Sequence, residues 1–544
     1  VGIILIVSLN STIQDYFVRF AAREEVYYLY DADKLDALDH LAQFTDDNNV
    51  YISQLWGDKH ATIYLLRGRQ QVASFDSTDT VVLPPPGTGA VYGFPAEQEK
   101  RAQRLADLWP QAELTLVEDN FGHPLIWTVS VPASALASWP LGYQPEREIE
   151  ARFFEAPTLI GFQDLDDNGE LALFWRSDEF TYRDLTAFVH LIDVDGRRVG
   201  QVDKLPGNGS YLTPDWAIGE RVVDRYRPAI QDLCAGGEEV RVQVGWYQYL
   251  ADNARMPRTD APGDSALAGT LKLPLESHPL QRFTPESRVD VAIGEELALA
   301  GYSLSDPPWE PGAPVRLDLI VQAGNDAAEL PMTVALSGEN SIVLWQGDFG
   351  KDAEWVDGEA ICRRLRLRLP PDSVPGEYQL TLSTATAATE LAAVEIVPST
   401  RNYVLPNVDT TVDVRYGDEI TLRGYRAEAT EGEDRLIVTL IWQALTSPAN
   451  NYKTFVHVLN ADGEIIAQSD AEPADGYATS GWLGGEFVED NHQISLPPGV
   501  EPGELWLRIG LYEPISGERL PAVGEDGQSL PDNAATLSAL TDQP

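Results

Sequence analysis

A long internal repeat constrains the fold of this chain more than any other feature. The segment TFVHVLNADGEIIAQSD at residues 454–470 closely resembles AFVHLIDVDGRRVGQVD at residues 187–203. The likeness extends over about 90 residues, from a Gly-aromatic pair near 161 or 424 to a tyrosine in the last strand of each copy. Solenoid repeats have periods of roughly 20–50 residues, so this longer repeat predicts two copies of a whole domain.

The spacing of rare residues supports this duplication. Trp175 and His190 are 15 positions apart in the first copy, as are Trp442 and His457 in the last. A glutamine follows each histidine after 11 positions, and a second tryptophan precedes an aspartate by 8 positions in both copies. Chance agreement at so many positions is not expected, and we interpret the two segments as a duplication.

Each copy has a pattern typical of β-structure. LIVTLIW and TFVHVL are short runs rich in β-forming residues, and NADGE and DVDGR contain the Asp-Gly pairs that close hairpins. Strands that recur at intervals of roughly 10 residues predict an antiparallel β-sandwich of immunoglobulin-like or jelly-roll kind. We expect Trp175 and Trp442, which lie in apolar strands, to be buried between the sheets.

A weaker third unit lies between the two copies. It repeats the Gly-Tyr start at Gly301-Tyr302, and its LPPDSVPGEYQLTLSTA parallels LPPGVEPGELWLRIGLY, but it lacks the histidine and the Asp-Gly segment. We interpret it as a degenerate repeat. The predicted boundaries are 145–275 for the first sandwich, 287–398 for the second and 405–530 for the third.

The region from 21 to 140 has a different pattern. DADKLDALDHLAQF places Leu35, Leu38, Leu41 and Ala42 on one helical face, and AEQEKRAQRLADLWP predicts a second helix. NNVYISQLW and PLIWTVSVP are β-rich runs that follow these helices. Helices alternating with strands predict a small α/β domain. The predicted fold class is therefore multidomain: a small N-terminal α/β domain followed by three antiparallel β-sandwich domains.

The first 20 residues allow two interpretations. The run VGIILIV is apolar, but its seven residues fall far short of the roughly 20 that span a bilayer. It is either a buried element at the start of a soluble domain or the outer end of a transmembrane helix whose remainder precedes Val1. We favour the second, in which 1–20 is the end of a truncated helix with its juxtamembrane segment.

The charge of the chain bears on its binding partners, and its cysteines bear on metal binding and disulfide formation. With 85 acidic and 39 basic residues the formal net charge is −46, which opposes binding to phosphate backbones, so no nucleic-acid partner is expected. Cys234 and Cys362 form no CxxC and no metal-ligand cluster. We predict two unpaired thiols, which does not exclude an oxidising compartment.

No catalytic signature is present in the sequence. The seven histidines form no HExxH and no close pair, and the chain contains no GxSxG. We therefore expect no catalytic residue and no cofactor on this chain.

The repeated positions nevertheless provide candidate ligand-binding residues. These are His190, Glu220 and Asp224 in the first copy and His457, Glu486 and Asp490 in the last. The acids of each pair are four residues apart, which on a strand places both carboxylates on one face, where calcium or sugar hydroxyls could bind. The favoured alternatives are structural: hydrogen-bonded histidines within the sandwich and solvated charges at a sheet edge.

A second local pattern resembles half of a calcium loop. In DLDDNGE at 164–170 the candidate metal ligands are Asp164, Asp166 and Asn168. The twelfth position of such a loop would be Trp175, where a bidentate glutamate is needed. A hairpin turn is therefore favoured over a calcium site.

Several phrases resemble a known family. DYFVRFAAREEVYYLYDADKLDALDHL, VYIS and HATIYLL look like the segment after the last transmembrane helix of certain bacterial membrane glycosyltransferases, akin to dolichyl-phosphate-mannose–protein mannosyltransferases (family 39-type). The phrase W-x-x-G-E-x-x-x-D and the segment from Gly510 to Leu520 are similar to the soluble tails that some of these proteins carry.

The resemblance implies a location rather than a reaction site. In that family a multi-span bundle takes sugar from a polyprenyl-phosphate donor, and the catalytic acid lies in a loop between membrane helices, so no catalytic residue transfers to this chain. The resemblance implies a membrane-anchored tail on the extracytoplasmic face, which positions the lipid-linked sugar or the glycan acceptor, or stabilises the membrane part. The alternative is a cell-surface carbohydrate-binding or structural array of β-sandwiches.

Overall fold

The computed structural model describes most of the chain. The described residues are 2–20, 22–45, 48–53, 72–75, 80–166, 168–249, 251–294, 297–323, 330–338, 341–429, 435–498, 500 and 505–538. They form two compact units. The first comprises Val1–His190, Gln201–Ala229 and Val242–Gly269, and the second comprises Leu191–Gly200, Ile230–Arg241 and Thr270–Pro544.

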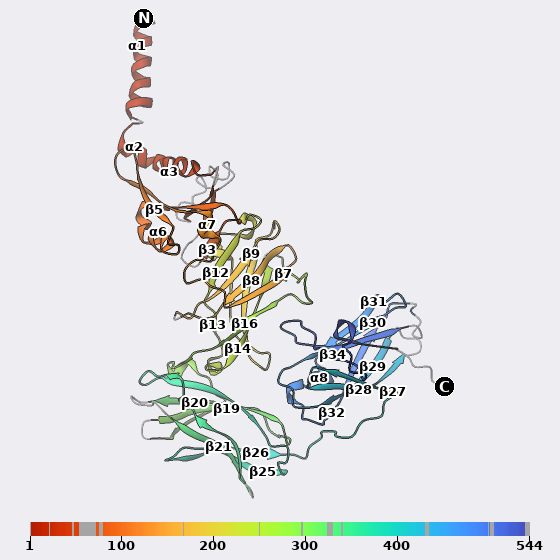
Figure 1. Cartoon of the computed structure of the whole chain (residues 1–544). Coiled ribbons are helices and arrows are strands. Elements are labelled where there is room, and N and C mark those ends of the chain that lie inside the picture. Colours follow the sequence, from red (N-terminus) through yellow and green to blue (C-terminus); the bar gives the residue numbers. More distant parts are fainter. Residues whose placement is uncertain are drawn as a thin grey trace. The chain divides into compact units, whose positions relative to one another are not determined.

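Helices are concentrated at the start of the first unit (Figure 1). Their bounds are Gly2–Ile13 for α1, Gln14–Phe20 for the π-helical η1, Glu24–Leu29 for α2, Ala32–Ala42 for α3, Glu99–Ala106 for α6 and Ala133–Leu136 for α7. The two helices predicted from the sequence correspond to α3 and α6. Among the residues described, none of the helices combines the length and the apolar character needed to cross a membrane.

A five-stranded sheet forms the rest of the α/β part, as predicted, with the order β2-β1-β4-β6-β5. In that order its strands are Val72–Phe75, Asn48–Ser53, Gly89–Pro95, Pro124–Val131 and Glu113–Glu118. Leu38 and Leu41 of α3 pack with Val50 and Ile52 of β1. Leu35 was expected on the same face, but it is 44% exposed, and the buried residues of α3 are Ala37, Leu38 and Leu41.

The phrase VYIS lies in β1, whereas HATIYLL at 60–66 lies outside the described residues.

One sheet of the first sandwich lies wholly in the first unit, with the order β3-β12-β9-β8-β7. In that order its strands are Thr80–Leu83, Arg221–Tyr226, Leu171–Arg176, Ala156–Gln163 and Arg147–Phe153. β3 comes from a distant part of the sequence and pairs antiparallel with β12, from Leu83 opposite Arg221 to Thr80 opposite Asp224. The edge of this sheet is therefore covered by a strand that lies outside the repeat.

The other sheet of the first sandwich has the order β13-β11-β10-β14-β15, with β16 also paired to β14. The strands, with β16 last, are Ala229–Ile230, Arg198–Lys204, Thr186–Ile192, Glu239–Gln248, Ala254–Arg255 and Ala266–Lys272. Residues of this sheet belong to both units.

The second sandwich, in the second unit, has two four-stranded sheets and a short parallel pair. The first sheet, in the order β18-β19-β20-β24, contains Ser287–Ala292, Leu297–Leu304, Pro314–Ala323 and Ala360–Arg368. The second, in the order β22-β21-β25-β26, contains Ile342–Asp348, Pro331–Ser337, Gly376–Ser383 and Ala388–Ile396. The short pair joins β17 (Leu275–Glu276) to β23 (Ala353–Glu354).

The third sandwich also lies in the second unit. One sheet, in the order β32-β29-β28-β27-β34, contains Phe487–Ser495, Arg435–Ala444, Ile420–Ala429, Thr410–Tyr416 and Ala522–Val523. The other, in the order β31-β30-β33-β35, contains Ile465–Ala471, Lys453–Leu459, Trp506–Tyr512 and Ala535–Ser538. A short helix, α8 (Pro473–Gly476), follows β31.

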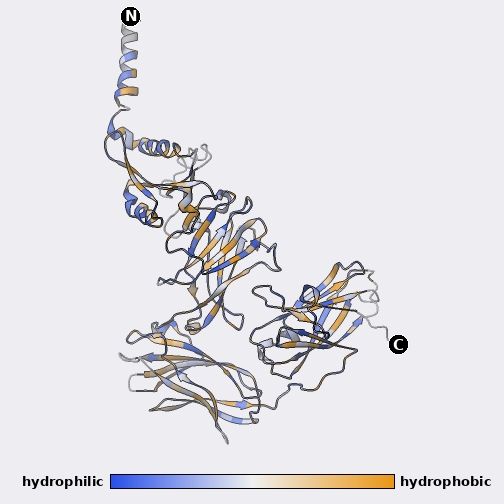
Figure 2. Cartoon of the chain, viewed as in Figure 1, coloured by the Kyte–Doolittle hydropathy of each residue, from blue (hydrophilic) through white to orange (hydrophobic). Residues whose placement is uncertain are grey.

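Several strands have one buried and one more exposed side, whereas β4 and β10 are buried along their whole length. Along β32, buried residues alternate with exposed ones, and Figure 2 shows hydrophobic and hydrophilic residues interleaved within the sheets. This alternation is typical of antiparallel sheets that cover a core on one face.

The first and third sandwiches have the same register around their tryptophans. The cross-strand partners are Leu159 and Val222 for Trp175, and Leu422 and Val488 for Trp442. Both tryptophans are fully buried, as predicted. The same strand pairing around the tryptophan therefore recurs in both sandwiches.

A register shift beside a glycine recurs in all three sandwiches. The ladder shifts just before Gly161, Gly301 and Gly424. An added Cβ would meet a neighbouring side chain at 2.7 Å (Pro145), 2.5 Å (Pro285) and 2.7 Å (Val408), respectively. These close approaches leave no room for a side chain, so the glycine of each Gly-aromatic pair is required by the local packing.

The two cysteines are joined in a disulfide bond, so the prediction of unpaired thiols is wrong. Cys234 lies on η5 (Leu233–Ala235) and Cys362 on β24, both in the second unit, with their Cα atoms 4.6 Å apart. The residues are 128 positions apart in the sequence. Pairing depends on the proximity of the backbones in the fold, which sequence spacing does not reveal.

Candidate functional site

Glu220, a candidate ligand residue of the first sandwich, is buried within a hydrogen-bond network. The Tyr51 hydroxyl donates to Oε1 at 2.6 Å, and the Tyr211 hydroxyl donates to Oε2 at 2.5 Å. The Ala217 amide donates to Oε2 at 2.8 Å. Burial raises the pKa of Glu220 above its usual value, although these hydrogen bonds act in the opposite direction. The carboxylate links β1 to the first sandwich.

Glu486 has the same role in the third sandwich. The Leu483 amide donates to Oε2 at 2.9 Å and the Tyr477 hydroxyl donates to Oε1 at 3.2 Å, as the corresponding amide and tyrosine do for Glu220. Arg401 Nη1 replaces the tyrosine of β1 and donates to Oε2 at 2.6 Å. In each copy the glutamate thus holds a residue that precedes the sandwich in the sequence.

Asp224, four residues after Glu220, is also buried, but its hydrogen-bond partners are different. The Thr80 hydroxyl of β3 donates to Oδ1 at 2.7 Å, and Lys204 Nζ lies 3.0 Å from the same oxygen. Burial raises the pKa of Asp224, and the charge of Lys204 only partly offsets this effect. The residue therefore secures the edge strand β3.

Asp490 occupies the same position on β32. Trp442 Nε1 donates to Oδ2 at 3.1 Å, the Thr454 hydroxyl donates to Oδ2 at 2.8 Å, and the Ala474 amide donates to Oδ1 at 3.0 Å. His492 Nε2 lies 3.1 Å from Oδ2. Burial alone would raise the pKa of Asp490, but the hydrogen bonds and the neighbouring histidine lower it overall.

The interpretation of these acids as solvated edge charges is wrong. The exposed fractions are 3% for Glu220, 0% for Asp224, 3% for Glu486 and 1% for Asp490. Strand alternation identifies which residues share a face, but not whether other segments cover that face. At Glu220, Asp224 and Glu486 the covering groups include β1, β3 and the segment around Arg401, all far away in the sequence.

His190 and His457 lie in equivalent packed clusters. Each is almost buried, and each ring is next to the phenylalanine two positions earlier, with ring centroids 4.8 Å apart for His190 and 4.9 Å apart for His457. Arg255 covers Phe188 at 4.5 Å, and Arg519 covers Phe455 at 4.3 Å. Burial lowers the pKa of His457. Both histidines are therefore packed within the sandwich. The favoured interpretation also expected them to be hydrogen-bonded, but among the described residues His457 Nδ1 has no hydrogen-bond partner.

The candidate calcium residues form a tight turn. Asp166 Oδ1 accepts hydrogen bonds from the amides of Asn168 at 2.8 Å and Glu170 at 3.0 Å, and the Leu165 amide donates to Asp164. Asp193 and Asn460 cap the Asp-Gly turns of the two repeat copies with the same pair of amide contacts. The favoured hairpin turn is therefore what the structure contains at this segment.

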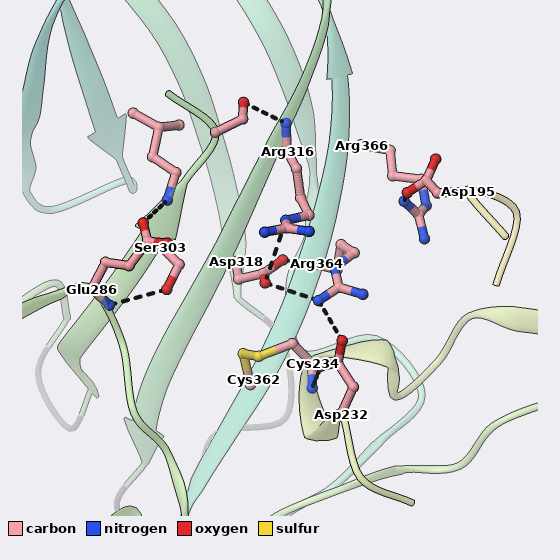
Figure 3. Close-up of polar contacts among 12 residues, drawn as sticks. Asp195, Asp232, Cys234, Glu286, Ser303, Arg316, Asp318, Cys362, Arg364 and Arg366 are labelled. Carbon is pink, nitrogen blue, oxygen red and sulfur yellow. Dashed lines mark hydrogen bonds and ion pairs between the residues drawn. A yellow bond between two sulfur atoms is a disulfide. The ribbon is translucent and has the colours of Figure 1, made fainter. Parts of the chain in front are cut away.

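A polar junction in the second unit was not foreseen from the sequence. Arg364 on β24 makes two 2.9 Å hydrogen bonds to Asp318 and one of 2.8 Å to Asp232, close to the disulfide (Figure 3). Arg366, two residues later, bonds Asp193 at 3.1 Å and Glu238 at 3.0 Å. The run RRLRLR at 363–368, in a chain with few basic residues, is the signal that could have identified it.

Together these arrangements are suited to holding segments in place. Within the described part of the chain, no group of three or more histidine, cysteine, aspartate or glutamate side chains is placed to hold a metal ion. The carboxylates that the repeat singles out are occupied by donors of the chain itself.

Comparison with known proteins leaves the family open. No protein-family model matches the chain, and no curated protein matches it. Among solved structures, a glycosyl hydrolase family 2 member from Bacteroides cellulosilyticus is similar at 9% identity over 39% of this chain and 27% of its own, with a TM-score of 0.13. The chain thus spans about a quarter of that hydrolase.

Two further solved structures are similar at the same level. They are native alpha-2-macroglobulin from Escherichia coli, domains NIE-MG1 (14% identity, 41% of this chain, 97% of that chain, TM-score 0.11), and dimeric latent PorU from Porphyromonas gingivalis (10% identity, 72% and 32%, TM-score 0.14). With TM-scores this low, none of these likenesses carries an argument about function.

Proposed function

We propose that this chain is a non-catalytic array of β-sandwiches that acts as a carbohydrate-binding or structural part of an extracytoplasmic assembly. The observation that carries the proposal is the burial of the repeated carboxylates. Glu220, Asp224, Glu486 and Asp490 are each at most 3% exposed and each accept bonds from the chain itself.

The burial of these acids argues against catalysis by them. A general acid or base must come within about 3 Å of the proton it transfers, directly or through one water molecule. Tyr51 and Tyr211 occupy this position at Glu220, and Arg401 occupies it at Glu486. Their removal would leave a buried carboxylate with fewer donors than it has oxygen lone pairs to satisfy, so access for a substrate would come at the expense of the fold.

The disulfide supports an extracytoplasmic location. Stable disulfides form in oxidising compartments and are rare in the cytosol of mesophiles. Cys362 is 1% exposed, so the bond is shielded by the packed cluster of Phe283 and Ile320. A protein that folds outside the cytoplasm would retain this bond.

The test is an assay for sugar transfer and hydrolysis. We expect the purified chain, incubated with a polyprenyl-phosphate sugar and candidate acceptors, to give no product detectable by mass spectrometry. Turnover would contradict the proposal. Its loss in the Glu220→Gln and Glu486→Gln variants would then assign catalysis to the sandwich acids, whereas its persistence would locate another site.

A second candidate is that the array is the tail of a polyprenyl-phosphate-sugar-dependent membrane glycosyltransferase. Exposed apolar residues at the N-terminal end favour it: Leu9 is 63%, Tyr16 65% and Phe17 72% exposed. Aromatic residues next to an apolar run are typical of a membrane interface. About ten hydrophobic spans encoded upstream of Val1 in the same reading frame would support this candidate, and a signal peptide directly upstream would favour the cell-surface array.

A further inference from the structure

Four exposed aromatic residues gather in the loops at one end of the first sandwich. The exposed fractions are 49% for Phe154, 45% for Phe180, 88% for Tyr182 and 68% for Tyr249. Phe154 lies in the turn between β7 and β8, Phe180 and Tyr182 lie in the loop between β9 and β10, and Tyr249 follows β14. All four belong to the first unit. We call this group the aromatic loop cluster.

Polar contacts hold the three segments of the cluster together. Arg183 Nε donates to Glu155 Oε2 at 2.8 Å, and its Nη1 donates to Gln248 Oε1 at 2.9 Å. The Glu155 amide donates to Glu179 Oε1 at 3.0 Å. Each of these residues is next to an aromatic member of the cluster, so the network fixes the loops that carry the rings.

The rings of Phe180 and Tyr182 stand close together in the central loop. Their centroids are 4.6 Å apart with an interplanar angle of 82°. Thr181, between them, is 6% exposed. Because the intervening side chain is buried, the two rings are displayed together away from the core.

The third sandwich provides an internal comparison, because its loops are anchored in the same way. The Leu185 amide donates to Thr213 Oγ1 at 3.1 Å, and the Tyr452 amide donates to Thr479 Oγ1 at 2.9 Å. Thr213 donates in turn to the Arg183 carbonyl, and Thr479 to the Asn450 carbonyl. The two loops therefore correspond residue by residue.

At the corresponding positions the third sandwich has no aromatic residues. Ser447 corresponds to Phe180, Ala449 to Tyr182 and Pro514 to Tyr249. The turn that corresponds to the one carrying Phe154 is Gly417–Glu419. The shared residues, such as the two tryptophans, are buried and required by the fold. The fold does not require aromatic residues in these loops, because the third sandwich forms without them.

We propose that the aromatic loop cluster is a binding site for neutral glycan chains. The inference deepens the proposed carbohydrate-binding role and rests on it. The apolar faces of pyranose rings pack on exposed Tyr and Phe side chains, and the carboxylates and amide at the cluster can bond sugar hydroxyls. An exposed aromatic group with fixed polar neighbours has this mixed character, and loops on a rigid scaffold are the usual place for binding residues.

The negative charge of the chain and of the cluster favours neutral over anionic glycans. The formal net charge of −46 opposes polyanions, including nucleic acids and sulfated or uronic polysaccharides. Within the cluster the charge of Arg183 is matched by Glu155 at 2.8 Å, and Glu179 adds a further carboxylate. The cluster therefore offers an anionic polysaccharide no unmatched cation.

The test compares the full chain with a variant that copies the third sandwich. Retardation in native gels would be measured with hydroxyethyl cellulose, laminarin, yeast mannan and xylan as probes. We expect retardation by at least one of them, with an affinity at least about tenfold weaker in the Phe180→Ser/Tyr182→Ala variant. Tyr403→Ala, which removes a 50% exposed aromatic residue from the segment just before the third sandwich, is the matched control and should bind as the unaltered chain does.

The outcomes separate this inference from the proposed function. Retardation by none of the four probes, or equal retardation of the loop variant, would overturn the glycan site but leave a structural, non-catalytic array standing. Sugar turnover would overturn the non-catalytic role, while a loss of binding in the loop variant would still support the site. An unchanged circular dichroism spectrum would show that the loop variant is folded, as expected for such exposed positions.

Discussion

Asp224 of the first sandwich and Asp490 of the third occupy the same strand position but have pKa values shifted in opposite directions. Burial raises the pKa of Asp224. At Asp490 the effect of burial is outweighed by hydrogen bonds, led by that from His492, so the pKa is lowered. Two residues after the aspartate, the first copy has Tyr226 and the third has His492. A shared fold therefore places the carboxylate, but its neighbours decide the direction in which its pKa is shifted.

The largest expected effect tests whether the two copies depend equally on their central tryptophans. Trp442→Ala and Trp175→Ala should each lower the free energy of unfolding by about 3–5 kcal/mol, because both leave large cavities between the sheets. Chemical denaturation of the full chain, followed by circular dichroism, measures this loss. Trp506→Ala, at a 48% exposed position on β33, is the control and should cost about 0.5 kcal/mol. A cost below about 1 kcal/mol at Trp442 would contradict its burial.

The next largest effect is expected from removing the side chains that donate hydrogen bonds to Glu486 and Glu220. Arg401→Met leaves the carboxylate of Glu486 buried without its cation and should cost about 3–5 kcal/mol. Tyr51→Phe removes only a neutral donor from Glu220 and should cost about 1–3 kcal/mol. The same denaturation experiment measures both. A larger loss of unfolding free energy in Tyr51→Phe than in Arg401→Met would contradict this expected order.

The smallest effect concerns the pH dependence of stability. A lowered folded pKa at Asp490 contributes stability above the unfolded pKa of about 3.9, and this is lost as the pH falls through the folded value. A raised folded pKa at Asp224 contributes stability below the unfolded pKa, and this is lost as the pH rises through the folded value. Asp490→Asn should therefore weaken the loss of stability in acid, and Asp224→Asn should weaken the loss on raising the pH. Melting temperatures between about pH 3 and 7 measure both, and slopes altered in the same direction would refute the contrast.

Local patterns predicted the strands, the small α/β region and the buried tryptophans, because alternation and turn residues depend on near neighbours in the sequence. They did not predict that the four repeated acids are buried. Tyr51 reaches Glu220 across 169 residues, and Thr80 reaches Asp224 across 144. The covering groups of Glu220, Asp224 and Glu486 include segments outside the repeat, so comparing the copies could not reveal them. Asp490 is covered by residues of its own sandwich, which strand alternation alone does not indicate. The disulfide was missed for the same reason.

The aromatic loop cluster escaped the sequence analysis for a different reason. The residues that the two copies have in common are those that the fold requires, and they are buried. Phe180 and Tyr182 are visible only as differences between the copies, once their exposure is known. Between two similar sandwiches, the positions at which the sequences differ are therefore the better candidates for binding.

The disulfide affects how the chain responds to cleavage of its backbone and to mechanical tension. Cys234 and Cys362 are 128 positions apart, and their bond closes the segment between them into a covalent ring. A single cut by a protease anywhere inside that ring leaves both fragments attached to each other through sulfur. The same bond carries tension directly from η5 to β24, so the polypeptide inside the ring adds no length when the chain is pulled from its ends.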